Sequence, residues 1–487
     1  MPRYGTVNRM DISPHEPGRA FLAVHRYRED DWRPYVFRTN DYGESWDLLT
    51  DGMNGIPEDH WVRVVREDDV QRGLLYAGTE FGLFVSFDDG AHWQPLQMNL
   101  PATPIMDLKV HPSGDLAVAT QGRSFWLLDD LTPLRELAAA VQWPGEMAGA
   151  AVPARGGPGS AAPESVAAGG TSRQEGRGAA GDILSGAPVI LFTPRDVPRG
   201  RASPPMSEMD LNLPDPLPEG ALLSYAVRGE VEDLALEVLD EEGDLVARWQ
   251  VGAEGEGGRA GRSGVSSQEG FHRLPWPLRY SELGGAKAPP GAYMARISWA
   301  GGSQERPFRV LPDPMNPEIT QEDYREQFRV TAEVYQASRK VGQALRQVES
   351  VKAQARNIME KARDAERNVG ALPDLLGELE KALAPLEARL TSQDDPSVPT
   401  GEEPPQGAGL DSEYRTLLYY LNSGGGYGAG GAEGRPTSGA MERKAELEAA
   451  WREIRARLEP TLESGVAAFN EEVARLGLEG IVFRKEG

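Results

Sequence analysis

The chain has 487 residues, enough for about three domains, and a formal net charge of −24 that places the pI near 4.8. So acidic a chain repels the phosphates of nucleic acids and anionic lipids, which excludes general nucleic-acid binding. It contains no cysteine, and therefore no disulfide or thiolate metal ligand. No run of about 18 apolar residues predicts a membrane-spanning helix, and the N-terminal segment does not resemble a signal peptide. We therefore expect no membrane insertion.

Residues 1–131 are predicted to form short strands separated by turns. β-branched and aromatic residues are dense there, and glycine, aspartate and proline bound the runs. The expected strands cover residues 7–12, 20–24, 35–38, 61–65, 74–77, 83–86, 106–110, 116–119 and 124–128.

The same region contains an internal repeat. The octapeptide TNDYGESW at 39–46 returns 47 positions later as SFDDGAHW at 86–93. A third, shorter copy ends at Trp126 without the full motif. Units of 40–50 residues with four strands each are typical of β-propeller blades. We therefore predict a partial propeller of about three blades over residues 1–131.

Both octapeptides follow the pattern S/T-x-D-x-G-x-x-W, which indicates a turn. The aspartate carboxylate is expected to accept backbone N–H groups, the glycine to take a backbone conformation closed to other residues, and the tryptophan to fill the space between sheets. A carboxylate held in this way has a lowered pKa and is a poor general acid, so we interpret the motif as structural. Its residues are Asp41, Gly43 and Trp46 in the first copy and Asp88, Gly90 and Trp93 in the second.

A segment of the first blade, HRYREDDW, is the candidate ligand-binding loop. It places His25, Tyr27, Arg28 and Trp32 in a hairpin excursion. Propeller ligands usually bind at one end of the disc, where such loops project. The simpler alternative is a solvated loop anchored by Trp32.

The sequence offers no recognisable catalytic constellation. The six histidines lack metal-ligand spacing, and there is no nucleophile elbow, phosphate-binding loop or dinucleotide fingerprint. The acidic pairs at 88–89 and 129–130 point to opposite sides of a strand end and seldom share an ion. We therefore expect no cofactor and no metal site, and the catalytic residues stay unknown.

Beyond residue 131 the composition changes three times. Residues 132–187 are rich in Ala, Gly, Pro and Ser and predict a flexible linker. Residues 188–313 predict a small antiparallel sandwich of the Ig-like type, in which Trp249, Trp276 and Trp299 form either core or a sugar platform. Residues 314–487 predict an antiparallel helical bundle with flexible breaks near 391–410 and 422–438.

The bundle begins with a heptad pattern typical of a coiled coil. Positions a are Val334, Val341, Val348, Ala355 and Ala362, and positions d are Ala337, Ala344, Val351, Ile358 and Ala365. A leucine stripe from Leu372 to Leu390 predicts a second helix, and an apolar face from Leu447 to Val473 predicts a last one.

The blade segment closely resembles the last blades of the bacterial sortilin-like, Asp-box (BNR) repeat proteins, which are often labelled glycosyl hydrolases. The resemblance is carried by HRYREDDWRPYVFRTNDYGESW, by RVVREDDVQRGLLYAGTEFGLFVSFDDGAHWQPLQMNLP and by DLAVATQGRSFWLLDDLTPL. The sandwich and the helical tail, ending in FNEEVARLGLEGIVF, resemble the C-terminal region of that family. The resemblance implies a secreted or periplasmic parent protein with further N-terminal blades, of which this chain is the C-terminal half.

Two classes of function stay open. The favoured one is a non-catalytic envelope or extracellular binding or scaffold protein with a protein or glycan ligand. The alternative is the C-terminal fragment of a secreted glycan-acting glycosyl hydrolase, sialidase-like or xyloglucanase-like, whose catalytic residues lie in the missing N-terminal part. No arginine cluster with a Tyr/Glu pair and no pair of flanking carboxylates is assignable, so no catalytic residue is transferred from the family.

Overall fold

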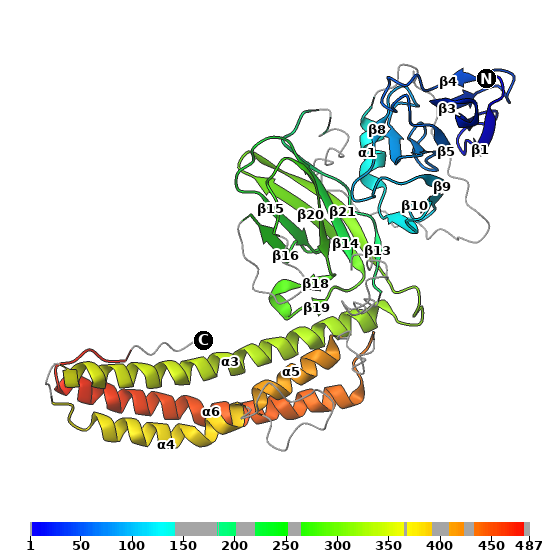
Figure 1. Cartoon of the computed structure of the whole chain (residues 1–487). Helices are drawn as coiled ribbons and strands as arrows, with labels where there is room; N and C mark the ends of the chain where they lie inside the picture. Colours follow the sequence, from blue (N-terminus) through cyan, green and yellow to red (C-terminus); the bar gives the residue numbers. More distant parts are fainter. Residues whose placement is uncertain are drawn as a thin grey trace. The chain divides into compact units, whose positions relative to one another are not determined.

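The computed structural model describes residues 2–141, 183, 185–200, 220–251, 264–364, 368–391, 409–422 and 433–481. It forms two compact units (Figure 1). Unit 1 combines Met1–Val197, Leu217–Pro277 and Ala292–Arg309, and unit 2 combines Pro198–Pro216, Leu278–Gly291 and Val310–Gly487.

Unit 1 begins with three antiparallel sheets in which the strand order follows the chain order. Sheet 1 contains β1 (Thr6–Ile12), β2 (Ala20–Arg26), β3 (Asp31–Thr39) and β4 (Asp47–Leu48). Sheet 2 contains β5 (Val62–Glu67), β6 (Leu75–Thr79), β7 (Leu83–Ser86) and β8 (Gln94–Pro95). Sheet 3 contains β9 (Ile105–His111), β10 (Asp115–Thr120) and β11 (Phe125–Leu128).

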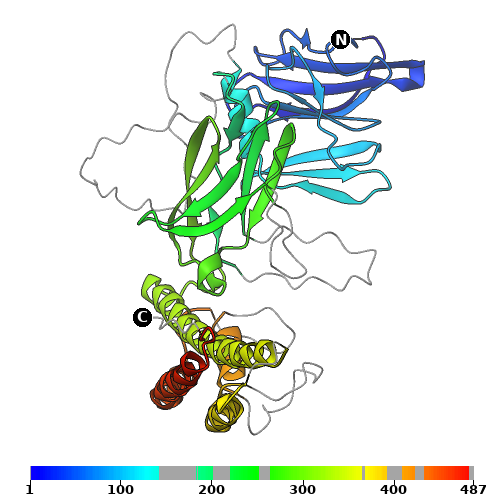
Figure 2. The same ribbon diagram turned by 90° about the vertical axis from the view of Figure 1, so that its left-hand side faces the viewer.

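The three sheets stack face to face (Figure 2). Alternate residues of a strand point to opposite faces, so each sheet can offer one face to each neighbour. Sheet 1 packs Phe21 and Val36 against Leu75 and Phe84 of sheet 2. The other face of sheet 2 packs against sheet 3, with Val64, Tyr76, Val85, Leu108 and Leu116 in one core. This succession of small antiparallel sheets agrees with the predicted series of blades.

The linker predicted for 132–187 is wrong at its start. Thr132–Ala140 forms helix α1, with a proline in the first turn, where a missing N–H costs nothing. Ala138 is buried in the core shared by sheets 2 and 3. The alanine-rich run indicated low complexity, yet alanine is also the strongest helix former, and packing decides between the two. Residues 142–182 lie outside the described residues.

Two further sheets lie in the region 188–313 and pack against each other. The first has the order β12-β14-β17, and the second has the order β13-β21-β20-β15-β16. Trp276 joins them, because its ring lies 5.3 Å from Tyr293 and 5.8 Å from Phe308. Trp276 is fully buried, so it belongs to the core and not to a sugar platform. The strands are β12 (Val189–Leu191), β13 (Val197–Pro198), β14 (Ala221–Val227), β15 (Ala235–Leu239), β16 (Leu245–Gln250), β17 (Gly270–Trp276), β20 (Gly291–Trp299) and β21 (Gly302–Leu311).

Unit 2 is dominated by four helices, three of which lie side by side in Figure 1. They are α3 (Gln321–Asp364), α4 (Leu372–Leu390), α5 (Leu410–Leu421) and α6 (Ser438–Arg475). The five predicted a positions of α3 are at most 1% exposed. Four of them, all except Ala362, belong to one core with the leucine stripe of α4 and the apolar face of α6. Ala365 lies outside the described residues.

A buried ion pair ties the segment before α6 to the rest of unit 2. The Glu433 carboxylate accepts hydrogen bonds from Arg199 Nε at 3.0 Å and from Lys287 Nζ. Arg199 also donates to Gln327 Oε1 of α3 at 2.6 Å. Lys287 belongs to the two-stranded sheet of β18 (Arg279–Tyr280) and β19 (Ala286–Lys287). The flexible break predicted near 422–438 is therefore wrong for Glu433, since its charge is held by two buried cations.

No helix of the described residues is both long and apolar enough to cross a membrane.

Candidate functional site

The turns of the two octapeptide motifs connect β3 to β4 and β7 to β8, at the same end of sheets 1 and 2. Asp41 Oδ1 accepts the backbone N–H of Ser45 at 2.9 Å, and Asp88 Oδ1 accepts that of His92 at 2.8 Å. Gly43 and Gly90 have φ of 92° and 86°, the left-handed region that favours glycine. Hydrogen bonds from the hydroxyl and backbone of Ser45 lower the pKa of Asp41 to about 2. The Asp41 carboxylate therefore stays ionised at neutral pH and stabilises the turn by accepting these hydrogen bonds.

The two tryptophans that end the octapeptide motifs, Trp46 and Trp93, differ in burial. Trp93 is 4% exposed and lies between sheets 1 and 2, and its Nε1 donates to the Leu49 carbonyl at 3.4 Å. Trp46 is only partly buried, packs on the opposite face of sheet 1, and donates its Nε1 to the Gly43 carbonyl at 3.1 Å. In the second copy of the motif the tryptophan fills the interface between sheets 1 and 2. In the first copy it lies on the outer face of sheet 1.

Three residues of the predicted ligand loop meet at the opposite end of the sheets. The turn η1 (Tyr27–Glu29) joins β2 to β3 and ends at Asp30, whose φ is 57°. Tyr27 stacks on His25 with ring centroids 4.8 Å apart, and Trp32 lies 6.3 Å from Tyr27. The fourth ring is Trp61, directly before β5, at 4.7 Å from Tyr27 and 5.1 Å from His25. We call His25, Tyr27, Trp32 and Trp61 the aromatic cluster.

Two arginines flank the aromatic cluster. The guanidinium of Arg63 lies 4.2 Å from the centre of the Trp61 ring, in cation–π geometry, and donates to Glu80 Oε2 through Nε and Nη2 at 2.8 and 2.6 Å. Arg28, the fourth residue of the predicted loop, lies 5.8 Å from the centre of the Tyr27 ring and is exposed. Its Nε donates to the Tyr27 hydroxyl at 3.4 Å, and the exposed guanidinium also faces solvent, where a ligand can reach it.

Two ring nitrogens inside the aromatic cluster are buried without a partner. His25 Nδ1 and Trp61 Nε1 make no hydrogen bond to the described residues, although the two side chains are only 7% and 3% exposed. Leaving a buried polar group unpaired costs about 1–3 kcal/mol, and native proteins keep few such groups. Trp32, in contrast, is 46% exposed. The cluster thus has a buried polar base and an open aromatic rim.

Burial lowers the pKa of His25 below its usual 6.5, and the positive charges of Arg28 and Arg63 lower it further. The folded chain therefore binds a proton at His25 less readily than the unfolded chain does. We expect the free energy of unfolding of unit 1 to be unaffected by His25 above about pH 6.5 and to fall as the pH drops from there through the folded pKa. Denaturant titrations at several pH values would measure this slope.

The matched control for that titration is His111→Gln, which removes an exposed histidine of the same unit. His25→Gln should abolish part of the acid sensitivity, whereas His111→Gln should preserve it. If the free energy of unfolding of His25→Gln fell with decreasing pH as steeply as that of the wild type, His25 would not be the source of the acid sensitivity.

Two carboxylates next to the aromatic cluster, Asp31 and Glu80, already have partners. Asp31 accepts from Arg26, from Arg33 and from the Tyr35 hydroxyl at 2.7–3.0 Å, and the hydrogen bond from Arg33 holds its pKa well below the usual range. Glu80 is held by Arg63. General acid catalysis needs a carboxyl with a raised pKa, whereas the hydrogen bond from Arg33 lowers that of Asp31.

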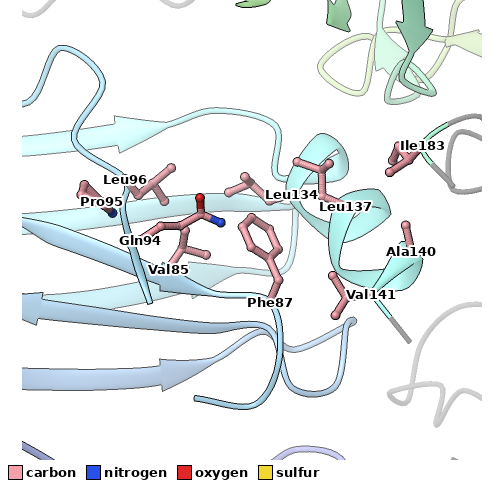
Figure 3. Close-up of a pocket in the computed structure, with 10 residues that line it drawn as sticks. All are labelled: Val85, Phe87, Gln94, Pro95, Leu96, Leu134, Leu137, Ala140, Val141 and Ile183. Carbon is pink, nitrogen blue, oxygen red and sulfur yellow. The ribbon is translucent and has the colours of Figure 1, made fainter. Parts of the chain in front are cut away.

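A separate pocket of about 460 Å³ lies between the edge of sheet 2 and helix α1 (Figure 3). None of its lining residues is ionisable, so it offers no acid or base. The lining consists of Val85, Phe87, Gln94, Pro95, Leu96, Leu134, Leu137, Ala140, Val141 and Ile183. Among the described residues, no three His, Asp or Glu side chains gather as a metal site would require.

Sequence reasoning missed Trp61 and Arg63. They stand about 30 positions after the predicted loop, and their place in the site follows from the stacking of sheet 1 on sheet 2. The available signal was the repeat itself, since adjacent blades bring the β2–β3 turn of one unit to the first strand of the next.

No family model matches the chain, and no curated protein matches it in sequence. Among solved structures, it is similar to the Niastella koreensis GH74 enzyme, at 13% identity and a TM-score of 0.22, over 26% of this chain and 21% of that one. It is also similar to YCF48 bound to a D1 peptide, at 17% identity and a TM-score of 0.19, over 26% and 36% of the two chains. A third similar structure is the extracellular domain of BT4673 from B. thetaiotaomicron, at 12% identity and a TM-score of 0.20, over 63% and 31%.

The chain therefore spans about a third or less of the length of these neighbours, and the similarity carries no argument about function. The strand order and packing themselves define a multidomain, β-rich protein whose first three sheets are arranged like propeller blades.

Proposed function

We propose that the chain is a non-catalytic binding protein that holds an extracellular protein or glycan ligand at the aromatic cluster. The observation that carries this proposal is the combination of an exposed Trp32, an exposed Arg28 beside Tyr27 and two buried ring nitrogens without a hydrogen-bond partner among the described residues. Aromatic faces offer large, rigid contact areas, and a few placed polar groups orient a ligand.

The ring nitrogens add directionality to this surface. The indole N–H of Trp61 is a donor, while His25 Nδ1 can donate or accept according to its tautomer. A ligand with hydroxyl or amide groups would satisfy both, and sugars and peptide backbones carry such groups. The exposed guanidinium of Arg28 then supplies charge-assisted hydrogen bonds at the rim.

Membership of the sortilin-like, Asp-box family belongs to the same proposal. It is supported by the two turns with their carboxylate-to-backbone hydrogen bonds and by the sandwich and helices that follow the sheets. In this proposal the parent protein is secreted or periplasmic, and the Ig-like sandwich and the bundle serve as further interaction modules.

The test is a screen of the intact chain against immobilised oligosaccharides and peptides, followed by titration of each hit. Trp32→Ala and Arg28→Ala should weaken any genuine hit about tenfold or more, as the loss of an interface aromatic or arginine commonly does. Both side chains are exposed, so the variants should fold normally.

Tyr42→Ala is the matched control, because Tyr42 is 82% exposed and lies in the Asp-box turn at the other end of sheet 1. It should bind like the wild type. A ligand that binds Trp32→Ala and Arg28→Ala as tightly as it binds the wild type would bind at another surface. Release of reducing sugar from a bound glycan by the intact chain would overturn the non-catalytic assignment and favour the hydrolase alternative.

A further inference from the structure

The pocket beside helix α1 is bordered by two apolar cores. Leu134 of α1 lines the pocket and packs against the core that sheets 2 and 3 share. Leu137, three residues further along α1, also lines the pocket, but it packs against Ile190 of β12 and the nearby Phe192. Ile183 lines the pocket and packs on the same cluster as Leu137. The pocket therefore lies at a junction, where the blade-like sheets meet the sheet of β12, β14 and β17.

Much of the apolar lining of the pocket remains in contact with solvent. Phe87, Leu96 and Ile183 are half-buried, and Val141 is 37% exposed. Protein interiors are packed as densely as organic crystals, and few of their voids exceed a water molecule. The volume of about 460 Å³ lies within the range of about 300–1,000 Å³ for small-molecule sites, which occur preferentially at domain interfaces. Size and position thus both fit a ligand site.

The lining also restricts the charge of a ligand. None of the ten lining residues is ionisable, in a chain whose net charge is −24. A charged group that entered the pocket would lose hydration and gain no counter-ion. Gln94 has the polar side chain among the ten, and Figure 3 shows its amide turned toward Leu134 and Phe87. Because an amide both donates and accepts hydrogen bonds, Gln94 can orient one hydroxyl, carbonyl or amine group.

We propose that the pocket binds a neutral, mostly apolar small molecule that carries one hydrogen-bonding group. The apolar body covers the half-buried side chains, and the polar group bonds to the amide of Gln94. The ligand contacts Leu134 on the side of sheets 2 and 3, and Leu137 and Ile183 on the side of β12. It fills the junction between the two cores and stabilises the folded state of unit 1 by mass action. This site is separate from the aromatic cluster, none of whose residues lines it.

The test titrates the intact chain with N-phenyl-1-naphthylamine, a neutral aromatic amine whose fluorescence rises in apolar surroundings. Its binding should be saturable and should raise the midpoint of thermal unfolding of unit 1. The comparison probe is 1-anilinonaphthalene-8-sulfonate, which has the same rings and an added sulfonate. It should bind about tenfold more weakly or worse, because the sulfonate meets an uncharged wall. Equal affinity for the two probes would overturn the assignment of a neutral ligand.

The variant Gln94→Glu places a carboxylate at the pocket. Gln94 is exposed, so the variant should fold normally, and it should raise the Kd for N-phenyl-1-naphthylamine about tenfold or more. Gln268→Glu is the matched control, because Gln268 is an exposed glutamine of unit 1 outside the lining. It should bind the neutral probe like the wild type.

Three results would overturn the proposal. The first is the absence of saturable binding of N-phenyl-1-naphthylamine to the wild type. The second is a Gln94→Glu variant that binds this probe as tightly as the wild type does. The third is loss of binding in Trp32→Ala, because that result would place the probe at the aromatic cluster.

Discussion

Replacing Val348 with aspartate is expected to lower the free energy of unfolding of the helical unit by about 4–5 kcal/mol, among the largest effects of a single substitution. Val348 is fully buried at an a position of α3, in one core with α4 and α6. A carboxylate there loses its hydration and gains no cationic partner among the neighbouring apolar side chains. Far-UV circular dichroism during denaturant unfolding of the intact chain measures the loss, because the long helices dominate that signal.

Ser350→Asp provides the control, since Ser350 lies two residues further along α3 and is exposed. It adds the same charge to the same helix and should change stability by less than about 0.5 kcal/mol. Equal effects of the two substitutions would show that helix propensity or net charge, and not burial, decides the outcome. A helical transition in Val348→Asp like that of the wild type would contradict the packing of α3.

The heptad of α3 could be predicted because local periodicity and burial coincide there. Each a position is small and apolar, and the structure buries all five. Glu433 shows the opposite case. It follows a glycine-rich run, and nothing nearby in sequence indicates that Arg199 and Lys287, more than 140 positions earlier, enclose its carboxylate. A buried ion pair of this kind is created by tertiary packing and leaves no local signature.

The candidate site was predictable only for the residues that lie close together in sequence. His25, Tyr27 and Trp32 lie close together in sequence, and the turn between β2 and β3 keeps them close in space. Trp61 joins them because sheet 2 stacks on sheet 1, a contact between segments distant in the chain. The sequence pattern therefore predicts the loop, whereas the burial of Trp61 Nε1 beside it follows only from the tertiary packing.

Trp93→Ala should destabilise unit 1 by roughly 3–5 kcal/mol, the usual cost of truncating a buried aromatic side chain. Trp93 is 4% exposed between sheets 1 and 2, and its removal leaves a cavity bordered by both sheets. Thermal or denaturant unfolding followed by near-UV circular dichroism or hydrogen exchange in β5–β7 reports this loss. Retention of stability with loss of a ligand would show that the box serves binding and not folding.

Trp46→Ala is the matched comparison, because Trp46 holds the same place in the first copy of the motif. Trp46→Ala should lower the free energy of unfolding by only about 1 kcal/mol, since Trp46 is already partly in contact with water. Equal losses of stability in the two variants would show that the difference in burial between the two tryptophans does not decide the cost of truncation.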